Sequence, residues 1–271
     1  MLNLEFITVT WPHKTPGTAQ AQEEEIVLKK LSLLLFVALA VAGVPLAGLA
    51  QATFRQVTYV ADSGGTNVAF ITSPAITLGA GDFVHVSCRT GFGSTKSIVV
   101  RSNPPNAFNP LPIQAGGPGS QQSSYAMNVR PGPTTFTCAP NAPAPYQSMI
   151  VLHYSVPFGS GALDKWVGST TPAEPTYTSP SFSTSSSGAE LIILCGTVAS
   201  TDYAFTAGSI GSLKTTLRGV SAYSLQAHAD AGCEDAIATV PQKLIKGRIT
   251  YGESQPWAVT VGTFVLKGPA K

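Results

Sequence analysis

Two histidines in strand-like segments raise the question of hydrolytic chemistry. His85 and His153, with Asp82 or Asp164 and a serine, provide the residue types of a triad, which needs a nucleophile, a base and an orienting acid. The sequence has no Gly-x-Ser-x-Gly turn that would expose a nucleophilic serine. Single histidines on strands usually have structural roles, so we predict no catalytic residue.

A short acidic segment around Cys233 is a candidate cation site. His228, Asp230, Glu234 and Asp235 crowd together there, and carboxylate oxygens are the ligands that calcium prefers. The competing interpretation is a solvated acidic loop held by a disulfide. We favour this second interpretation and predict no cofactor.

Three aromatic residues in loop-like stretches are candidates for ligand binding, namely Trp166, Tyr177 and Tyr146. Exposed aromatic rings stack on sugars, and loops at the ends of β-sandwiches often carry such sites. The alternative is that these rings, with Tyr125, cover the ends of the fold.

Four cysteines, Cys88, Cys138, Cys195 and Cys233, predict two disulfides, because an even number in an exported chain is typical of a disulfide framework. Four cysteines allow three pairings. Strand parity places Cys88 on one face with Val84 and Val86 and supports pairing it with Cys138. Cys195 would then pair with Cys233, giving one bridge per half. The spacing does not suit zinc.

The chain begins with a segment typical of export. Lys29-Lys30 precede an apolar run over residues 31–50, which ends on the small-x-small site Ala50-Gln51-Ala52. This order predicts a signal peptide over residues 27–52 and a secreted product, at the cell surface, outside the cell or in the periplasm. A membrane-anchoring helix over the same run is the rival, but we predict cleavage and no membrane span afterwards.

Residues 1–26 do not look like part of this signal. Glu23-Glu24-Glu25 place negative charge where export favours positive charge. We expect that translation starts at Val27, read as Met, and that residues 1–26 are a misassigned start; the alternative is an extended leader.

The remaining residues, 53–271, have the composition of an extracellular β protein. Only 11% of the chain is charged, 44% is apolar, and glycine and proline are frequent. The charges are scattered, with no basic stripe, so we predict no nucleic-acid partner. Short bursts rich in β-branched and aromatic residues predict strands at 57–60, 68–71, 83–88, 97–100, 134–138, 148–156, 190–198, 203–206, 220–227, 248–251 and 258–266. Only 213–218 and 236–245 could hold a helical turn.

The two halves of this region are weakly similar. Residues 76–88 align with 183–195, each with a turn, an acid, a strand and a cysteine. We predict halves at 53–158 and 176–268, joined by a Ser/Thr/Pro-rich connector. The favoured fold is one antiparallel β-sandwich, jelly-roll-like, with interleaved halves; the alternative is two tandem immunoglobulin-like sandwiches.

Several segments carry a resemblance to known proteins: Asp62-Ser63-Gly64-Gly65-Thr66-Asn67, the Gly-Asp-strand segment that follows, 150–155 and 162–164. On these residues the chain resembles uncharacterised secreted β-sandwich proteins of soil bacteria, of jelly-roll or concanavalin-like architecture. The resemblance implies an exported bacterial sandwich and no particular activity. The four cysteines depart from the pattern of that group.

The function expected from these observations is non-catalytic binding of a glycan or a partner protein at the cell surface or outside the cell. One alternative is a carbohydrate-active hydrolase on the same fold, although a pair of carboxylates facing across a cleft is not evident from the sequence. Another is a structural subunit of an extracellular assembly, in which edge strands pair with neighbours.

Overall fold

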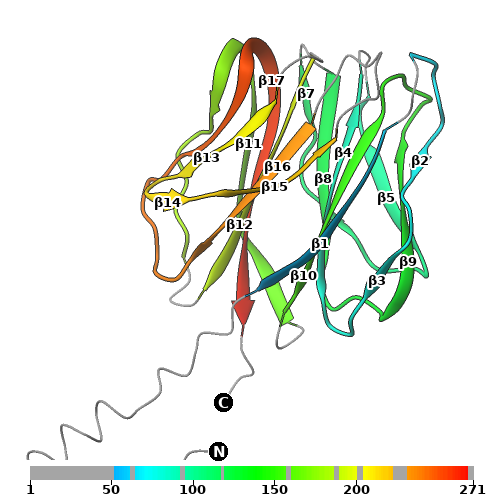
Figure 1. The fold of residues 1–271 in the computed structure, drawn as a ribbon, viewed down its shortest axis with the longest axis horizontal. Coiled ribbons are helices and arrows are strands. Elements are labelled where there is room, and N and C mark those ends of the chain that lie inside the picture. The colour runs from blue at the N-terminus through cyan, green and yellow to red at the C-terminus, as the bar shows by residue number, and fades with distance from the viewer. Residues whose placement is uncertain are drawn as a thin grey trace, which may run out of the picture. The chain divides into compact units, whose positions relative to one another are not determined.

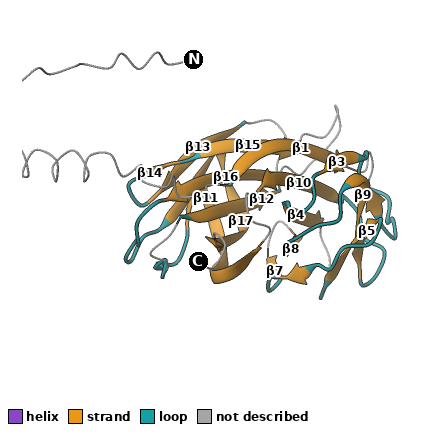
Figure 2. Cartoon of the chain, turned by 90° about the horizontal axis from the view of Figure 1, so that it is seen from below, coloured by secondary structure: helices purple, strands orange, loops and turns teal. Residues whose placement is uncertain are grey.

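Antiparallel strands make up the regular structure, which confirms the predicted all-β class. The computed structural model describes residues 52–61, 65–91, 95–116, 119–156, 160–185, 189–199, 204–221 and 231–267. These residues contain strands and loops but no helix (Figure 2). The predictions on residues 1–51, including the signal peptide up to its last residue, lie outside the described part.

The N-terminal half, residues 52–156, forms two sheets that enclose a core. Its strands are β1 (Thr53–Ala61), β2 (Ile71–Thr72), β3 (Ile76–Leu78), β4 (Phe83–Thr90), β5 (Ile98–Asn103), β6 (Asn109–Pro110), β7 (Gln114–Gly116), β8 (Gly119–Ala126), β9 (Gly132–Pro140) and β10 (Ser148–Ser155). A six-stranded sheet has the order β1-β10-β4-β8-β6, with β7 on β8. A four-stranded sheet has the order β2-β9-β3, with β5 on β9 (Figure 1). Between them pack Val86, Met149 and Phe136.

The C-terminal half, residues 160–267, forms one seven-stranded sheet of order β14-β13-β17-β12-β16-β15, with β11 on β17. Its strands are β11 (Ser160–Thr178), β12 (Glu190–Val198), β13 (Phe205–Ile210), β14 (Leu213–Lys214), β15 (Thr216–Ser221), β16 (Ala231–Ala238) and β17 (Gly247–Lys267). The long strands β11 and β17 arch together in Figure 1. Tyr177, Ile192 and Trp257 belong to a second core within this half.

A third core joins the two halves. Alternate residues of β10 and β4, such as Leu152 and Phe83, point away from the first core and pack against Leu191 of β12 and Phe264 of β17. The Phe83 and Phe264 rings lie 4.9 Å apart. The middle strands β10 and β4 of the six-stranded sheet are therefore buried on both faces, which explains why every residue of β4 is buried.

Three strands of eight or more residues occupy segments for which the sequence predicts something else. Residues 160–178, expected largely as a connector, form β11, and the acidic segment near Cys233 forms β16. The polar segment Gly119–Ala126, for which no strand is predicted, forms β8. Gln122 can be buried in β8 because its side-chain amide is hydrogen-bonded through both groups: it accepts from the backbone N–H of Ile98 and donates to the carbonyl of Leu111.

The described strands pair only within their own half, so the interleaving expected for a single sandwich does not occur among them. The helical turns expected at 213–218 and 236–245 are replaced by β14, β15, the end of β16 and a loop. The structure joins Cys88 to Cys138 and Cys195 to Cys233, the pairs that we favour from the sequence. Among the described residues there is no helix that could cross a bilayer.

Candidate functional site

An open pocket of about 640 Å³ lies at one end of the N-terminal half, where β1 and β10 meet β3 and the turn after it. We call it the Arg55–His153 pocket. It is lined by Arg55, Gln56, Thr77, Leu78, Gly79, Ala80, Asp82, His153 and Ser155. Most of these side chains are polar, so the pocket offers hydrogen-bonding groups rather than an apolar surface.

The turn between β3 and β4 fixes the position of Asp82. Gly81 has a positive φ of 80°, which favours glycine, and the Asp82 carboxylate accepts a hydrogen bond of 2.7 Å from the Gly79 N–H. A Cβ atom on Gly79 would lie 2.7 Å from Asp82 Oδ2, so a larger residue there would displace the carboxylate. The Gly-Ala-Gly-Asp sequence thus holds the acid at the floor of the pocket.

His153 meets this carboxylate from β10. Its Nε2 lies 2.6 Å from Asp82 Oδ2, and both residues are buried. Its Nδ1 lies 3.2 Å from Gln56 Nε2, which also donates to the Thr77 carbonyl. Because an amide nitrogen only donates, Nδ1 is the acceptor and Nε2 carries the proton that Asp82 accepts. Both ring nitrogens are therefore occupied.

This geometry tests the triad considered from the sequence. Of its members, Asp82 and His153 come together, whereas His85 lies in the core between the halves and Asp164 accepts hydrogen bonds from Ser185. The second imidazole nitrogen of His153 faces an amide, not a hydroxyl. The arrangement is suited to holding a polar ligand and does not position a nucleophile.

A bulge in β1 brings Arg55 to the pocket. The β1–β10 register shifts between Phe54 and Gln56, so Arg55 is the extra residue. In a regular strand Arg55 and Gln56 would point to opposite faces, but here both line the same pocket. Arg55 is exposed, and no described residue forms an ion pair with it. Within the described part of the chain, the pocket therefore presents at its rim a guanidinium that has no ion-pair partner.

The aromatic residues singled out from the sequence are not grouped at one site. Tyr177, expected in a loop, is fully buried in β11, and its hydroxyl is 2.8 Å from Ser169 Oγ, so its ring offers no face to a sugar. Trp166 also lies in β11, with 39% of its surface exposed. Tyr146 is half-buried, with a φ of 49°, in the segment before β10. None of the three lines the pocket.

The calcium candidates do not form a cluster in the described structure. Glu234 and Asp235 are neighbours on β16, so their side chains point to opposite faces, and both are buried. Asp235 accepts hydrogen bonds from the Tyr154 hydroxyl (2.7 Å) and Arg218 Nε (2.8 Å). Asp230 lies outside the described residues. No group of three or more His, Cys, Asp or Glu in the described ranges could hold a metal ion.

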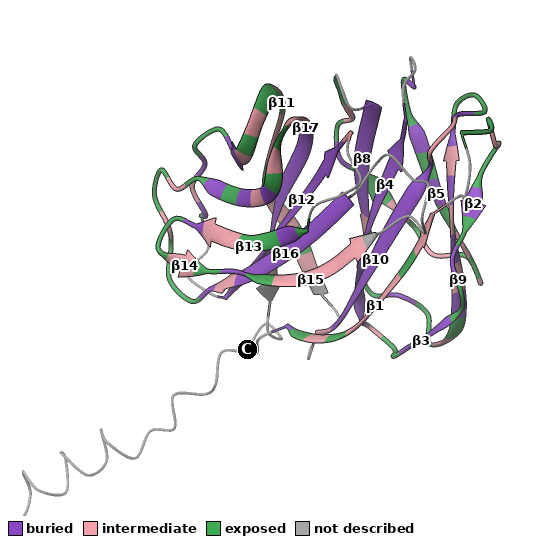
Figure 3. Cartoon of the chain, turned by 45° about the horizontal axis from the view of Figure 1, so that its top comes forward, coloured by how far each residue is buried: buried purple, intermediate pink, exposed green. Residues whose placement is uncertain are grey.

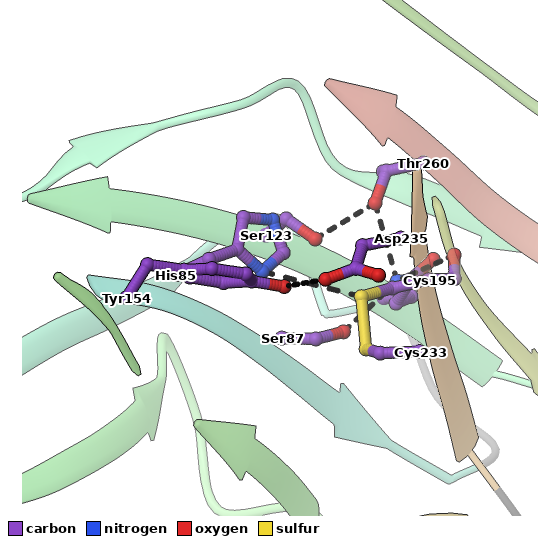
Figure 4. Close-up of a disulfide and its surroundings, with 9 residues drawn as sticks. His85, Ser87, Ser123, Tyr154, Cys195, Cys233, Asp235 and Thr260 are labelled. Carbon is purple, nitrogen blue, oxygen red and sulfur yellow. Dashed lines mark hydrogen bonds between the residues drawn. A yellow bond between two sulfur atoms is a disulfide. The ribbon is translucent and has the colours of Figure 1, made fainter. Parts of the chain in front are cut away.

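Burial shifts the pKa values of His85 and Glu234, which both lie outside the pocket. His85 is desolvated in the core between the halves, which lowers its pKa from 6.5 to about 3. Its Nδ1 is 4.0 Å from Cys195 Sγ (Figure 4). Burial raises the pKa of Glu234 from 4.5 to about 7, despite hydrogen bonds from the Gly208 N–H and the Thr215 hydroxyl. Both groups are neutral in the fold at mildly acidic pH.

Comparison with protein-family models, with curated proteins and with solved structures returns no match for this chain. The site is therefore judged on its own geometry.

Sequence reasoning named Asp82 and His153 but missed Arg55, Gln56 and Thr77. The bulge that exposes Arg55 has no marker in the local sequence, and Gln56 meets Thr77 only because β1 and β3 belong to different sheets that face each other. The Gly-x-Gly-Asp turn is the one local signal for this site.

Proposed function

We propose that the chain is a non-catalytic binding module and that the Arg55–His153 pocket is its ligand site. The observation that carries this proposal is the β1 bulge, which places the exposed Arg55 in the same pocket as the hydrogen-bonded Asp82–His153 pair. Bulges occur often next to functional sites, where they re-aim a side chain.

The chemistry of the lining favours a hydroxylated ligand that carries a carboxylate. Arg55 can bind a carboxylate in a bidentate manner, while Thr77 and Ser155 can exchange hydrogen bonds with hydroxyls. A glycan that contains uronic acid combines both groups. The aromatic residues Trp166, Tyr177 and Tyr146 have no part in this proposal.

Isothermal titration calorimetry with glucuronate-containing and neutral oligosaccharides tests the proposal. Wild type should bind the acidic ligand better, and Arg55→Gln should lose roughly tenfold or more in affinity, as expected when a hydrogen bond to a charged group is removed. Arg101→Gln is the matched control, because Arg101 is an exposed arginine on β5 in the same half. Equal loss in both variants, or no binding to either sugar class, would refute the assignment.

The hydrolase alternative finds less support in this pocket. A glycosidase needs two carboxyl groups across a cleft, and Asp82 is the one carboxylate among the described lining residues. Glu190 is buried on β12, and Asp164 is bonded to Ser185. We therefore propose binding without turnover.

We further propose that the protein is exported and consists of two tandem modules, a two-sheet sandwich and a module built on one seven-stranded sheet. Two disulfides are typical of proteins in an oxidising compartment. The confinement of strand pairing to each half, and the presence of a separate core in each, favour tandem modules over a single jelly-roll. Amino-terminal sequencing of the secreted product tests export: cleavage after Ala52 is expected, and a product that retains residues 27–52 would contradict it.

A further inference from the structure

The end of the C-terminal half presents two large apolar side chains to solvent. Val240 is 59% exposed and Leu244 is 78% exposed, both in the loop between β16 and β17. Leu244 also has a φ of 49°, in the left-handed region that leucine rarely adopts. The fold thus accepts an unfavourable backbone conformation while leaving this side chain outside the core.

Hydrogen bonds to Ser183 and Thr184 hold this loop in place. The Gln242 N–H donates to Thr184 Oγ1 (2.8 Å), and the Leu244 N–H donates to Ser183 Oγ (3.0 Å). Ile245 forms a β-bridge with the buried Phe182. The exposed side chains therefore project from an ordered support, which lowers the entropy lost when they bind a partner.

Cations flank these apolar residues in the chain and on the adjacent strands. Lys243, Lys246 and Arg248 follow in the same segment and are all exposed. Lys214 of β14 and Arg248 of β17 both lie opposite Ser209 of β13, so they share a face of the sheet. The Gly211 N–H donates to the Lys246 carbonyl (2.9 Å), which holds the β13–β14 turn beside the loop, around the label β14 in Figure 3.

We call Val240, Leu244, Lys214, Lys243, Lys246 and Arg248 the basic-apolar tip. Its cations are not neutralised locally, since no described residue forms an ion pair with any of them. Residues 236–252 and 204–218 contain no Asp or Glu. Two carboxylates lie near this segment in the fold. Asp164 accepts a hydrogen bond from the Ser185 N–H, and Glu190 is buried on β12, opposite Ala238.

We propose that the basic-apolar tip docks the protein on an anionic phospholipid bilayer. Apolar side chains that project beside lysines and arginines match the two layers of a membrane surface, which has negative headgroups above hydrocarbon. A folded acidic protein would match the cations but would not by itself require exposed apolar side chains between them. The tip lies in the C-terminal half and the Arg55–His153 pocket in the N-terminal half, so this inference does not depend on the proposed ligand.

Co-sedimentation with lipid vesicles tests this proposal. The mature protein should bind vesicles of phosphatidylcholine containing roughly 30% phosphatidylglycerol and should bind pure phosphatidylcholine at least roughly tenfold more weakly. Both Val240→Ser/Leu244→Ser and Lys243→Glu/Lys246→Glu should weaken binding roughly tenfold or more. Val99→Ser is the control, because Val99 is a comparably exposed apolar residue on β5 (47%). All substituted side chains are exposed, and thermal melting verifies that each variant folds.

The depth of insertion separates a membrane from other polyanions. Leu244→Trp should show a blue shift of fluorescence on the anionic vesicles and quenching by brominated acyl chains, and Val99→Trp should show neither. Absence of vesicle binding would overturn the proposal. Binding that persists in Val240→Ser/Leu244→Ser, or that occurs without quenching of Leu244→Trp, would also overturn it, because it would show attraction to negative charge alone.

Discussion

The two halves of the molecule use a similar strand-and-cysteine pattern in different ways. In the N-terminal half, Cys88 shares a face with Met149, points into the core of its own half and crosses to Cys138 on the opposite sheet. In the C-terminal half, Cys195 points toward the other half and bonds Cys233, its direct partner on the neighbouring strand. The Cys88–Cys138 disulfide links two facing sheets, whereas the Cys195–Cys233 disulfide links two neighbouring strands of one sheet.

This difference lies in the packing of the two sheets. Side chains alternate between the two faces of a strand, and the aligned cysteines occupy equivalent faces, but the sequence does not decide which face meets the other half. Residues 76–88 and 183–195 align by sequence, yet the cysteine of one faces its own core and that of the other faces the contact between the halves. A weak repeat therefore predicts similar strands without predicting similar roles.

The largest expected effect comes from removing either bridge. The chain-entropy model gives about 4 kcal/mol for closing loops of this length, so Cys88→Ala/Cys138→Ala and Cys195→Ala/Cys233→Ala should lose similar global stability. Hydrogen exchange should separate them. Exchange in β9 and β5 should accelerate in the first variant, because two sheets lose their covalent link. The β12–β16 ladder should stay protected in the second, and equal loss of protection at both places would break the comparison.

The next effect, on the order of a few kcal/mol, is a pH dependence of stability that has opposite sign in the core between the halves and in the C-terminal half. For His85 the folded pKa is lowered, so between pH 3 and 6.5 the unfolded chain binds the extra proton, and stability falls as pH falls through this window. For Glu234 the folded pKa is raised, so between pH 4.5 and 7 the folded chain keeps the proton, and stability falls as pH rises.

Urea denaturation of His85→Gln and Glu234→Gln between pH 3 and 7 measures the two pH-dependent contributions to stability. The stability of His85→Gln should fall as pH rises from 4.5 to 7, since the Glu234 term remains, and Glu234→Gln should become more stable as pH rises from 3 to 6.5. The other titratable groups are common to both variants, so the difference between the two pH profiles of stability reports on His85 and Glu234 alone. Parallel pH profiles would contradict these assignments.

A smaller effect is expected where the halves are joined by charge. Asp235→Ala removes the acceptor of Tyr154 and the partner of Arg218, whose guanidinium also lies 4.5 Å from the Phe54 ring centroid. Loss of a largely buried pair should cost about 2 kcal/mol. Asp164→Ala, on a partly exposed carboxylate bonded to Ser185, is the control and should change stability by less than about 1 kcal/mol. Similar melting temperatures for the two variants would show that this contact does not hold the halves together.

The smallest effect concerns the aromatic residues of β11. Tyr177→Phe should lower stability by about 1 kcal/mol, through loss of the hydrogen bond to Ser169, and should leave sugar binding unchanged. Calorimetry on the acidic and neutral oligosaccharides measures the second part. A loss of sugar binding in this variant would restore Tyr177 as a ligand-binding residue.

Much of the fold could be predicted from the sequence where strands are apolar, and little where they are polar. β4, β10 and β12 are rich in Val, Ile and Leu and lie within or close to the predicted ranges. β8 reads Gly-Ser-Gln-Gln-Ser-Ser-Tyr-Ala, and its burial depends on partners far along the chain: Gln121 Nε2 donates to the Cys195 carbonyl, and Ser123 bonds Thr260 (Figure 4). No local pattern contains those partners.

By itself, the sequence determined that the protein is built of antiparallel strands, because β-branched bursts between turn residues favour little else. It also determined that Cys88 shares a strand face with Val84 and Val86, because the two-residue period of a strand is a local property. Only the tertiary structure decided that Asp82 and His153 meet in one pocket with Arg55, and that the β13–β14 turn, with Lys214, lies beside the loop of Leu244. These contacts depend on a bulge, on facing sheets and on adjacent loops, and such long-range geometry is absent from any short stretch of residues.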